Sequence, residues 1–369
     1  QFPIKPGLII MNAANLCPSS YPVMETVFQL TRNVDSDVSY QNRAKFRDLH
    51  DKGLTMLGEY LGCGANEIVI TRNTSEGNGV VINGLDLKAG DEVVIWDENH
   101  PTNNVAWEVA AQRYGYRVKK VRLPNHPASD DDLIKPFIDA FTRNTKVVAF
   151  SHVSNLTGVG VPAKELCRMA QERGILSHID GAQTFGALSL DLHEIGCDFF
   201  TGSAHKWFVG PKETGILYVR KDRVDRLWPN LVGVGWKQSK DNAARKFSTL
   251  GQRDDAAVSA MAKTVEFHNH LGRERVEARI RELVGALRQG IRKNVPSAEF
   301  VTPEESRYNA GVLVFELPGI DLSNALATLY ENHHIGCTVR RGKFIRFCPH
   351  IYNTMDEVEK VVAAVKSLI

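Results

Sequence analysis

The sequence of 369 residues contains no long apolar run, no block of one charge and no CxxC pair. A membrane-spanning helix needs about 20 consecutive apolar residues, so we expect no membrane segment. The net charge of +2 gives little electrostatic support for nucleic-acid binding. The six scattered cysteines lack the spacing of metal ligands. We expect free thiols in a reducing compartment, with no zinc site and no disulfide framework.

The chain begins at Gln1 rather than at methionine, which indicates a processed or trimmed N-terminus and leaves a removed export leader open. Both glycosylation sequons, at Asn73 and Asn155, fall in turns that we assign below to a pocket. A glycan there would block the pocket, so passage through a eukaryotic secretory pathway is disfavoured. We therefore expect a cytoplasmic protein.

Short β-branched runs alternate with helical stretches from about Glu67 onward. Most runs are continuously apolar, which is typical of strands covered on both faces. The alternation predicts an α/β fold with right-handed crossovers and a mostly parallel sheet. The runs are EIVI (67–70), DEVVIW (91–96), KVVAFS (146–151), ILSHID (175–180), CDFFTG (197–202) and GILYVR (215–220).

The pattern changes after about Gly251, where apolar residues first repeat at helical spacing. The expected elements are helices at 255–294 (with a break near Gly272), 321–333 and 355–368, and strands at 311–317 and 343–348. We predict a large α/β domain at 15–250 and a smaller α+β domain that comprises residues 251–369 together with the N-terminal segment 1–14.

Ligands of such sheets bind beyond the carboxyl ends of the strands. After the first run, Thr74 and Ser75 begin a helix, and Gly77 and Gly79 keep its backbone close to its neighbours. Free N–H groups at the positive end of a helix dipole suit an anion. Taken alone, these residues are explained as well by an N-cap.

Asp180 ends one apolar strand, and Lys206 follows the next. A carboxylate at the mouth of an apolar strand is costly unless a cation meets it. Pyridoxal 5′-phosphate (PLP) would satisfy both residues, with its ring nitrogen at Asp180 and its aldehyde on Lys206 as a Schiff base. Its phosphate would lie at Thr74, Ser75, Ser203 and His205.

Three motifs, DGAQ (180–183), SAHKW (203–207) and GILYV (215–219), resemble the class-V aminotransferase family of fold-type I PLP enzymes, which contains the cysteine desulfurases. TRNTSEG (71–77) and HVSNLTG (152–158) add independent support. The similarity spans the chain from roughly Asn12 to its end. It implies a seven-stranded-type sheet, a small-molecule amino-acid substrate and a homodimer with active sites near the interface.

The resemblance also implies residue roles. The catalytic residues are Lys206, Asp180 and His100, of which His100 stacks on the pyridine ring. Gln183 contacts the 3′ oxygen of the ring, and Asn155 lies near the substrate and the same oxygen. Arg346 grips the substrate α-carboxylate, a task that suits a guanidinium group. The phosphate is held by Thr74 and Ser75 from one side and by Ser203 and His205 from the other.

Two departures from the family pattern bear on function. Cysteine desulfurases carry a nucleophilic cysteine on a loop before the carboxylate-binding arginine, whereas here Arg341-Gly342 leads directly to Arg346. Cys337 and Cys348 lie outside that place, which argues against persulfide-forming desulfuration. Gln252 stands where many relatives carry the threonine that reaches the partner subunit's phosphate, and it could donate a hydrogen bond there instead.

SAHKW followed by GPKETG (210–215) is most similar to the isopenicillin N epimerase-like subgroup, with cysteine C–S lyases close by. Both reactions begin with removal of the Cα proton. Epimerisation, β-elimination and transamination stay open, as does the substrate side chain, and a non-catalytic PLP-fold binding protein is the alternative from another class. A dinucleotide or P-loop enzyme is excluded by the lack of GxGxxG and GxxxxGK[ST].

Several other polar clusters have structural explanations. We expect His268 and His270 on a solvated helix face, His333-His334 at a helix end, and Asp130 to Asp132 as helix capping residues. Arg43 either reaches a substrate side chain or lies on a helix surface.

Overall fold

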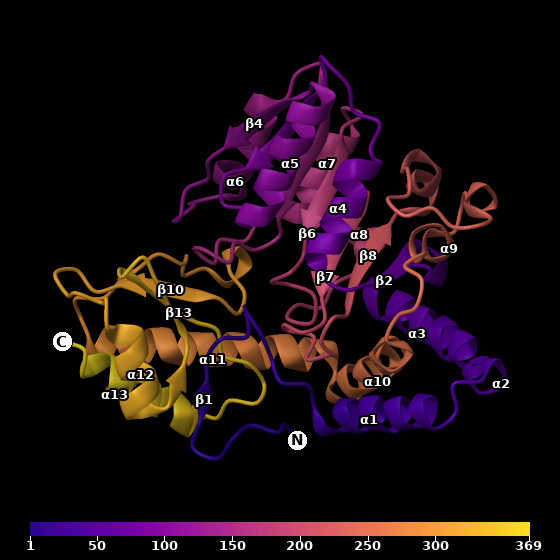
Figure 1. The fold of residues 1–369 in the computed structure, drawn as a ribbon. Helices are drawn as coiled ribbons and strands as arrows, with labels where there is room; N and C mark the ends of the chain where they lie inside the picture. The colour runs from indigo at the N-terminus through magenta and orange to yellow at the C-terminus, as the bar shows by residue number, and fades with distance from the viewer.

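The computed structural model describes all residues from Gln1 to Ile369, and a seven-stranded sheet forms its centre (Figure 1). The strands follow the order β2-β8-β7-β6-β5-β3-β4. They are β2 (Ile68–Thr71), β3 (Glu92–Trp96), β4 (Arg117–Val121), β5 (Thr145–Ser151), β6 (Leu176–Asp180), β7 (Phe199–Ser203) and β8 (Gly215–Val219). Only β8 runs against the others. The predicted mostly parallel α/β sheet is confirmed.

Both faces of this sheet are covered by helices. Alternate residues of β2 enter different cores, Ile68 and Ile70 one of them and Val69 the other. The helices of this part are α1 (Tyr21–Ser36), α2 (Tyr40–Arg43), α3 (Lys45–Leu61), α4 (Thr74–Gly84), α5 (Pro101–Tyr114), α6 (Asp130–Ala140), α7 (Ala163–Gln171), α8 (Leu192–Ile195) and α9 (Ala243–Phe247). Burial on both faces explains why the strands are continuously apolar.

Sequence analysis missed β4, RVKKV, because it is polar for a strand. It lies at the sheet edge, where it pairs only with β3. Two of its side chains, Arg117 and Lys119, form ion pairs with the buried Glu92 on β3. Charged residues are common on edge strands because they prevent pairing with other chains.

The C-terminal part contains a four-stranded sheet, ordered β12-β13-β10-β9. Its strands are β9 (Glu299–Phe300), β10 (Leu313–Glu316), β12 (Thr338–Arg340) and β13 (Phe344–Phe347), and its helices are α11 (Arg273–Asn294), α12 (Ala325–His333) and α13 (Met355–Lys366). Figure 1 shows this part, in orange and yellow, beside the large sheet. The helices and strands expected here are confirmed within a few residues.

The N-terminal residues belong with this smaller sheet. β1 (Ile9–Ile10) pairs with β11 (Ile335–Gly336), and Ile9 and Met11 enter the same core as α11 and α13. By contrast, α10 (Asp255–Leu271) packs on α1 and α3 and contributes Met261 to the core of the large sheet. The predicted division at residue 251 stays a prediction.

Two predicted helix ends are confirmed. α6 begins at Asp130, and the Asp132 carboxylate accepts a hydrogen bond from the N–H of Ser129 over 3.1 Å. α12 ends at His333, with His334 in a left-handed conformation. None of the helices has both the length and the apolar character that crossing a membrane requires.

Candidate active site

The first turn of α4 meets the end of β7. The Thr74 backbone N–H donates to Ser203 Oγ over 2.9 Å, and the two hydroxyl oxygens are 2.7 Å apart. Ser75 is exposed on the same turn, and Asn73 caps the helix by accepting from the N–H of Glu76. Hydroxyls and free N–H groups at a helix N-terminus suit a phosphate. The structure therefore brings three of the four expected phosphate residues together.

Gly77 and Gly79 differ in their surroundings. A Cβ added at Gly77 would lie 2.8 Å from Cγ2 of Thr201, so this position needs a residue without a side chain. A Cβ at Gly79 would meet nothing within 4 Å. The expectation of close backbone packing holds for Gly77 and is wrong for Gly79, which lies on the open side of α4.

Asp180 is buried at the end of β6, where three N–H groups donate to its carboxylate. They belong to the Asn78 side chain (3.0 Å), the Asn103 side chain (3.4 Å) and the backbone of Ala182 (3.0 Å). These contacts hold the carboxylate in place, and the buried site would accept a cationic partner such as a protonated ring nitrogen.

Lys206 follows β7 and forms neither a hydrogen bond through its amine nor an ion pair. Burial lowers the pKa of this amine, while the charge of Asp180 opposes the shift and that of Arg346 adds to it. An uncommitted lysine with a lowered pKa is suited to covalent and proton-transfer chemistry.

Two buried histidines hold the backbone just after Lys206. His350 Nε2 lies 2.8 Å from the Trp207 carbonyl, and His268 Nε2 lies 3.0 Å from that of Phe208. Because the Ile351 N–H donates to His350 Nδ1, the His350 proton is on Nε2 and donates to the carbonyl. Burial lowers the pKa of His268 to about 4 and that of His350 to about 3, so both are neutral at pH 7.

The expectation that His268 lies on a solvated helix face is therefore wrong. Its side chain is fully buried and stacks on Phe208, with ring centroids 4.7 Å apart. The physical reason is that α10 packs on α1 and α3 and also contacts the loop after Lys206 through Phe208, so most of its residues are buried. His270, two residues further on, is exposed.

Gln183 is held from two sides. Trp207 Nε1 donates to its Oε1 over 2.9 Å, and its Nε2 donates to the Ala14 carbonyl over 3.2 Å. One amide hydrogen of Gln183 remains available, which is compatible with the expected contact to a ring oxygen.

His100 and His205 are both neutral imidazoles near Lys206. His100 precedes α5, and because its Nδ1 accepts from the Thr102 N–H its proton is on Nε2. Burial lowers the pKa of His100, and the charge of Lys206 adds to the shift. Burial, with Lys206 and Lys212 adding, lowers the pKa of His205 to about 4.

Arg346 joins the smaller sheet to the large domain. It lies on β13, where it is 5% exposed, and donates to the Asn155 carbonyl (2.9 Å), Asn12 Oδ1 (3.2 Å) and Thr338 Oγ1 (3.3 Å). No carboxylate pairs with it, and its Nε is buried without a partner. A buried guanidinium with an unused donor fits an anion from outside the chain.

Gln252 lies apart from this group. Its side chain contacts Arg43 and the backbone of Arg253, and Arg43 also pairs with Asp255 over 3.4 Å. Within one chain Gln252 thus makes no contact with the other predicted cofactor residues, and its expected role toward a partner subunit stays a prediction. Arg43 lies on a helix surface, one of the two positions expected for it.

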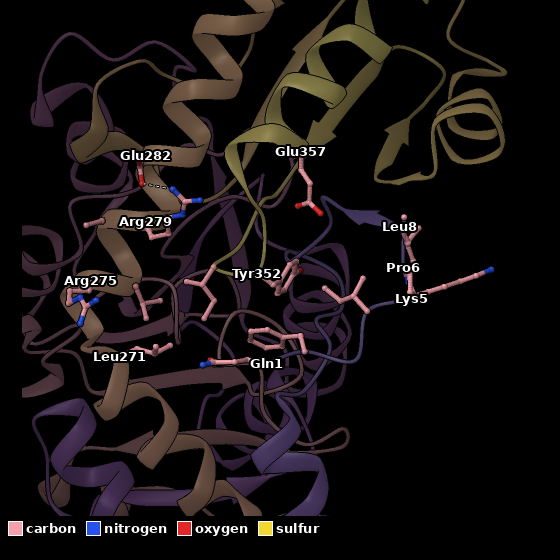
Figure 2. Close-up of a pocket in the computed structure, with 16 residues that line it drawn as sticks. Gln1, Lys5, Pro6, Leu8, Leu271, Arg275, Arg279, Glu282, Tyr352 and Glu357 are labelled. Carbon is pink, nitrogen blue, oxygen red and sulfur yellow. Dashed lines mark hydrogen bonds and ion pairs between the residues drawn. The ribbon is translucent and has the colours of Figure 1, made fainter.

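A cavity of about 970 Å³ lies elsewhere. Figure 2 shows it between the first eight residues, among them Gln1 and Leu8, and α11, with Arg279 and Tyr352 facing it. None of the predicted site residues lines this cavity, so its size does not make it the active site.

The fold and the strand-end site define a fold-type I PLP-dependent enzyme, as predicted. Residues 23–361 match the aminotransferase class-V family, and the chain therefore belongs to that family. The predicted family is confirmed. Fold-type I geometry and family membership imply PLP as the cofactor.

The chain is similar to both an epimerase and a probable desulfurase. The chain is 29% identical to the isopenicillin N epimerase of Amycolatopsis lactamdurans, with 100% of this chain and 97% of the relative covered. It is 27% identical to a probable cysteine desulfurase of Mycobacterium leprae, with 89% and 82% covered.

Solved structures agree on the fold. A cysteine desulfurase from Thermococcus onnurineus has a TM-score of 0.88 at 23% identity, with 100% of this chain and 96% of that chain covered. The cystine C-S lyase C-DES, in complex with cysteine persulfide, has a TM-score of 0.89 at 21% identity, with 99% of both chains covered.

The residues present fit PLP. Lys206 has a free amine, Asp180 is a buried carboxylate, Arg346 has an orphaned Nε, and hydroxyls meet at the start of α4. Sequence analysis missed the residues that position these groups. They are Asn12, Asn78, Asn103 and Thr338. Asn78 and Asn103 carried a weak signal, since both are polar residues near the start of helices that follow strands.

Proposed function

We propose that this protein is a PLP-dependent enzyme that removes and returns the Cα proton of an amino acid, in the manner of an isopenicillin N epimerase. The observation that carries the proposal is that the charges of Asp180 and Arg346 both act on the free amine of Lys206. Asp180 is buried, and Arg346 has no carboxylate partner and keeps one unused donor. The family includes relatives of this activity at 29% identity. A purely binding role is disfavoured because Lys206 and Asp180 are both retained.

Each residue has a distinct task in this proposal. PLP, when bound, supplies the electron sink for the negative charge that develops at Cα. Asp180 supports that charge separation from the end of β6. Lys206 takes up the Cα proton, aided by its lowered pKa. Arg346 fixes the substrate through its α-carboxylate, so that Cα–H faces the amine.

His100 is proposed as the ring platform on the other side of the site. Its neutral state and its Nε2–H follow from the Thr102 contact and from burial. A neutral imidazole in that place can also carry a proton, which an epimerase needs when it delivers a proton to the opposite face of Cα.

The hairpin before Arg346 contains no cysteine that could form a persulfide, which argues against a cysteine desulfurase. Arg340 on β12 pairs with Phe344 on β13, so the turn consists of residues 341–343 and holds no cysteine. Cys337 and Cys348 on either side are buried. Burial raises the pKa of the Cys337 thiol to about 12 and also raises that of Cys348, which disfavours a nucleophilic thiolate.

A C–S lyase is the second candidate, supported by the similarity of the fold to C-DES. It would share removal of the Cα proton and differ in expelling a β-substituent as a thiol or persulfide. The same residues would serve both reactions. The choice then depends on whether the substrate carries a leaving group.

Proton NMR in D₂O tests the proposal, with cofactor-loaded protein and a panel of amino acids and cysteine S-conjugates. We expect loss of the Cα proton signal without new products. Pyruvate with a released thiol would establish the lyase instead. Neither exchange nor product with any substrate would contradict both candidates.

We also propose a homodimer, supported by an exposed apolar segment at 228–234. Trp228, Leu231, Val232 and Val234 are all more than half exposed. Exposed apolar groups of this kind are typical of a protein interface. In the proposed dimer, Gln252 of one subunit would reach the cofactor phosphate of the other. Light scattering should give twice the chain mass, and Val234→Asp should shift it toward the monomer. A monomeric wild-type protein at working concentration would contradict the dimer.

A further inference from the structure

A recess of about 410 Å³ adjoins the place proposed for the substrate α-carboxylate. Glu98, Arg122 and Leu156 line it from the large domain, and Arg340 and Arg341 line it from the β12–β13 hairpin. Leu156 directly follows Asn155, whose carbonyl accepts from Arg346. The recess is therefore connected to Arg346 through the Asn155–Leu156 turn, and it lies at the boundary between the large domain and the smaller sheet.

The recess carries an excess of positive charge. Lys343 pairs with Glu316 over 2.8 Å, which leaves Arg122, Arg340 and Arg341 without an ion pair or a side-chain hydrogen bond. The one remaining carboxylate is Glu98. Its Oε2 already accepts from the hydroxyls of Ser154 (2.8 Å) and Thr157 (2.5 Å). Three unpaired guanidinium groups thus share one recess.

Arg340 connects this recess to the reaction site. Residues two apart on a strand point to the same face, so Arg340 shares a face with Thr338, whose hydroxyl contacts Arg346. Arg340 is half-buried. Burial lowers its pKa, the charges of Arg346 and Arg341 add to the shift, and the charge of Glu98 opposes it. Its charge also reaches His100, on the other side of the site.

We propose that Arg340, with Arg341 and Arg122, binds a carboxylate at the far end of the substrate side chain. The substrates would then be amino acids with a second, distal acidic group. The inference rests on the proposed function, because Arg346 takes the α-carboxylate and thereby directs the side chain toward the recess. The charges of Arg341 and Arg346 act against that of Arg340, and a bidentate carboxylate would relieve this repulsion. The alternative is a cluster of solvated surface arginines with no ligand.

Calorimetric titration of the holoenzyme with glutarate and pentanoate separates these cases. The two acids have five carbons each and differ only in the second carboxylate. We expect glutarate to bind at least about tenfold more tightly, a difference of about 1.4 kcal/mol, and Arg340→Gln to reduce its affinity to that of pentanoate. Arg292→Gln, an exposed arginine on α11, is the matched control and should change neither affinity.

Arg122→Gln gives a second variant should Arg340→Gln fail to fold, since Arg122 lies on the other wall of the recess. It should weaken glutarate binding selectively as well. Equal affinities of the wild-type protein for glutarate and pentanoate would overturn the proposal. So would equal losses for both acids in the variants.

Cα-proton exchange with glutamate and norvaline distinguishes failure of this inference from failure of the proposed function. We expect kcat/KM for glutamate to exceed that for norvaline, and to fall at least about tenfold in Arg340→Gln, mostly through KM, with norvaline unchanged. Equal exchange of both amino acids would sink the inference and leave the proposed function standing. Selective glutarate binding without Cα-proton exchange of any amino acid would contradict the proposed function and leave the carboxylate site standing.

Discussion

The side-chain amide of Asn78 on α4 donates to Oδ2 of Asp180 at the end of β6 over 3.0 Å. The amide oxygen of Asn78 accepts from the Thr201 hydroxyl (2.7 Å) and from His178 Nε2 (3.1 Å). One residue thus ties the helix proposed to hold the cofactor phosphate to the carboxylate proposed to face its ring. The carboxylate proposed as catalytic is thus positioned by the helix proposed to bind the other end of the same cofactor.

Asn78→Ala should lower the free energy of unfolding by about 2 to 4 kcal/mol. The substitution removes a buried acceptor, so the hydroxyl of Thr201 and the N–H of His178 lose their partner. Urea unfolding of the holoenzyme measures the effect, and cofactor absorbance after dialysis should show weaker retention. Asn83→Ala, at an exposed position of α4, should cost less than about 1 kcal/mol. Equal costs at the two positions would refute the role of Asn78.

Lys206→Ala should abolish turnover and the covalent attachment of the cofactor, because no other free lysine amine follows β7 in the site. Mass spectrometry after borohydride reduction measures the attachment, and NMR exchange measures turnover. Lys221→Ala, an exposed lysine, should leave both unchanged. Full activity of Lys206→Ala would contradict the assignment of this lysine.

Arg346→Ala should reduce kcat/KM by about 100-fold, since hydrogen bonds to a charged group contribute about 1.5 to 3 kcal/mol. The loss should be similar for acidic and neutral amino acids, because every substrate has an α-carboxylate. The loss in Arg340→Gln should instead be confined to acidic side chains. A loss in Arg346→Ala that depended on side-chain charge would contradict this division of labour.

Stability should fall as the pH is lowered below the ordinary histidine pKa of 6.5. Burial lowers the pKa of His178 and His268 to about 4 and that of His350 to about 3. Between pH 6.5 and about 4 the unfolded chain binds protons at these positions and the folded chain does not. Each such histidine reduces the free energy of unfolding by up to about 1.4 kcal/mol per pH unit there.

Urea unfolding of the holoenzyme at pH 7.5, 6 and 5 measures that slope. His268→Gln should reduce the slope of unfolding free energy against pH by the contribution of one histidine. His126→Gln, at an exposed position, should leave the slope unchanged. An unchanged slope in His268→Gln would show that the histidine does not resist protonation in the folded state.

Gly158→Ala should destabilise the protein by more than about 1 kcal/mol. Its φ is +79°, and an added Cβ would lie 2.6 Å from the Val312 carbonyl oxygen. The turn that carries Asn155 would have to move away from the smaller sheet, so the KM for substrate should rise as well. Gly285→Ala, inside α11 with open space around it, should stabilise by about 0.5 to 1 kcal/mol.

Prediction from sequence succeeded where local pattern and sheet geometry suffice. Asp180 ends one apolar strand and Lys206 follows the next, and the carboxyl ends of neighbouring parallel strands meet at one edge. Their proximity therefore follows from the alternation of strands and helices, without knowledge of the side-chain packing. The sequence also showed that the loop that carries the nucleophilic cysteine in desulfurases is absent. In the structure, the turn between β12 and β13 has three residues and no room for such a loop.

The tertiary structure decided what depends on packing between distant segments. The reversed direction of β8, the burial of His268 and the amide of Asn78 on Asp180 leave no local signature, because each is set by a neighbour far away in the chain. Arg346 shows the difference well. Its apolar strand marked it as unusual, but only the docking of β13 on the Asn155 turn leaves its Nε buried without a partner and brings its charge within reach of Lys206. The sequence determined which chemical groups the protein carries at its strand ends, and long-range packing decided which of them remain free to act.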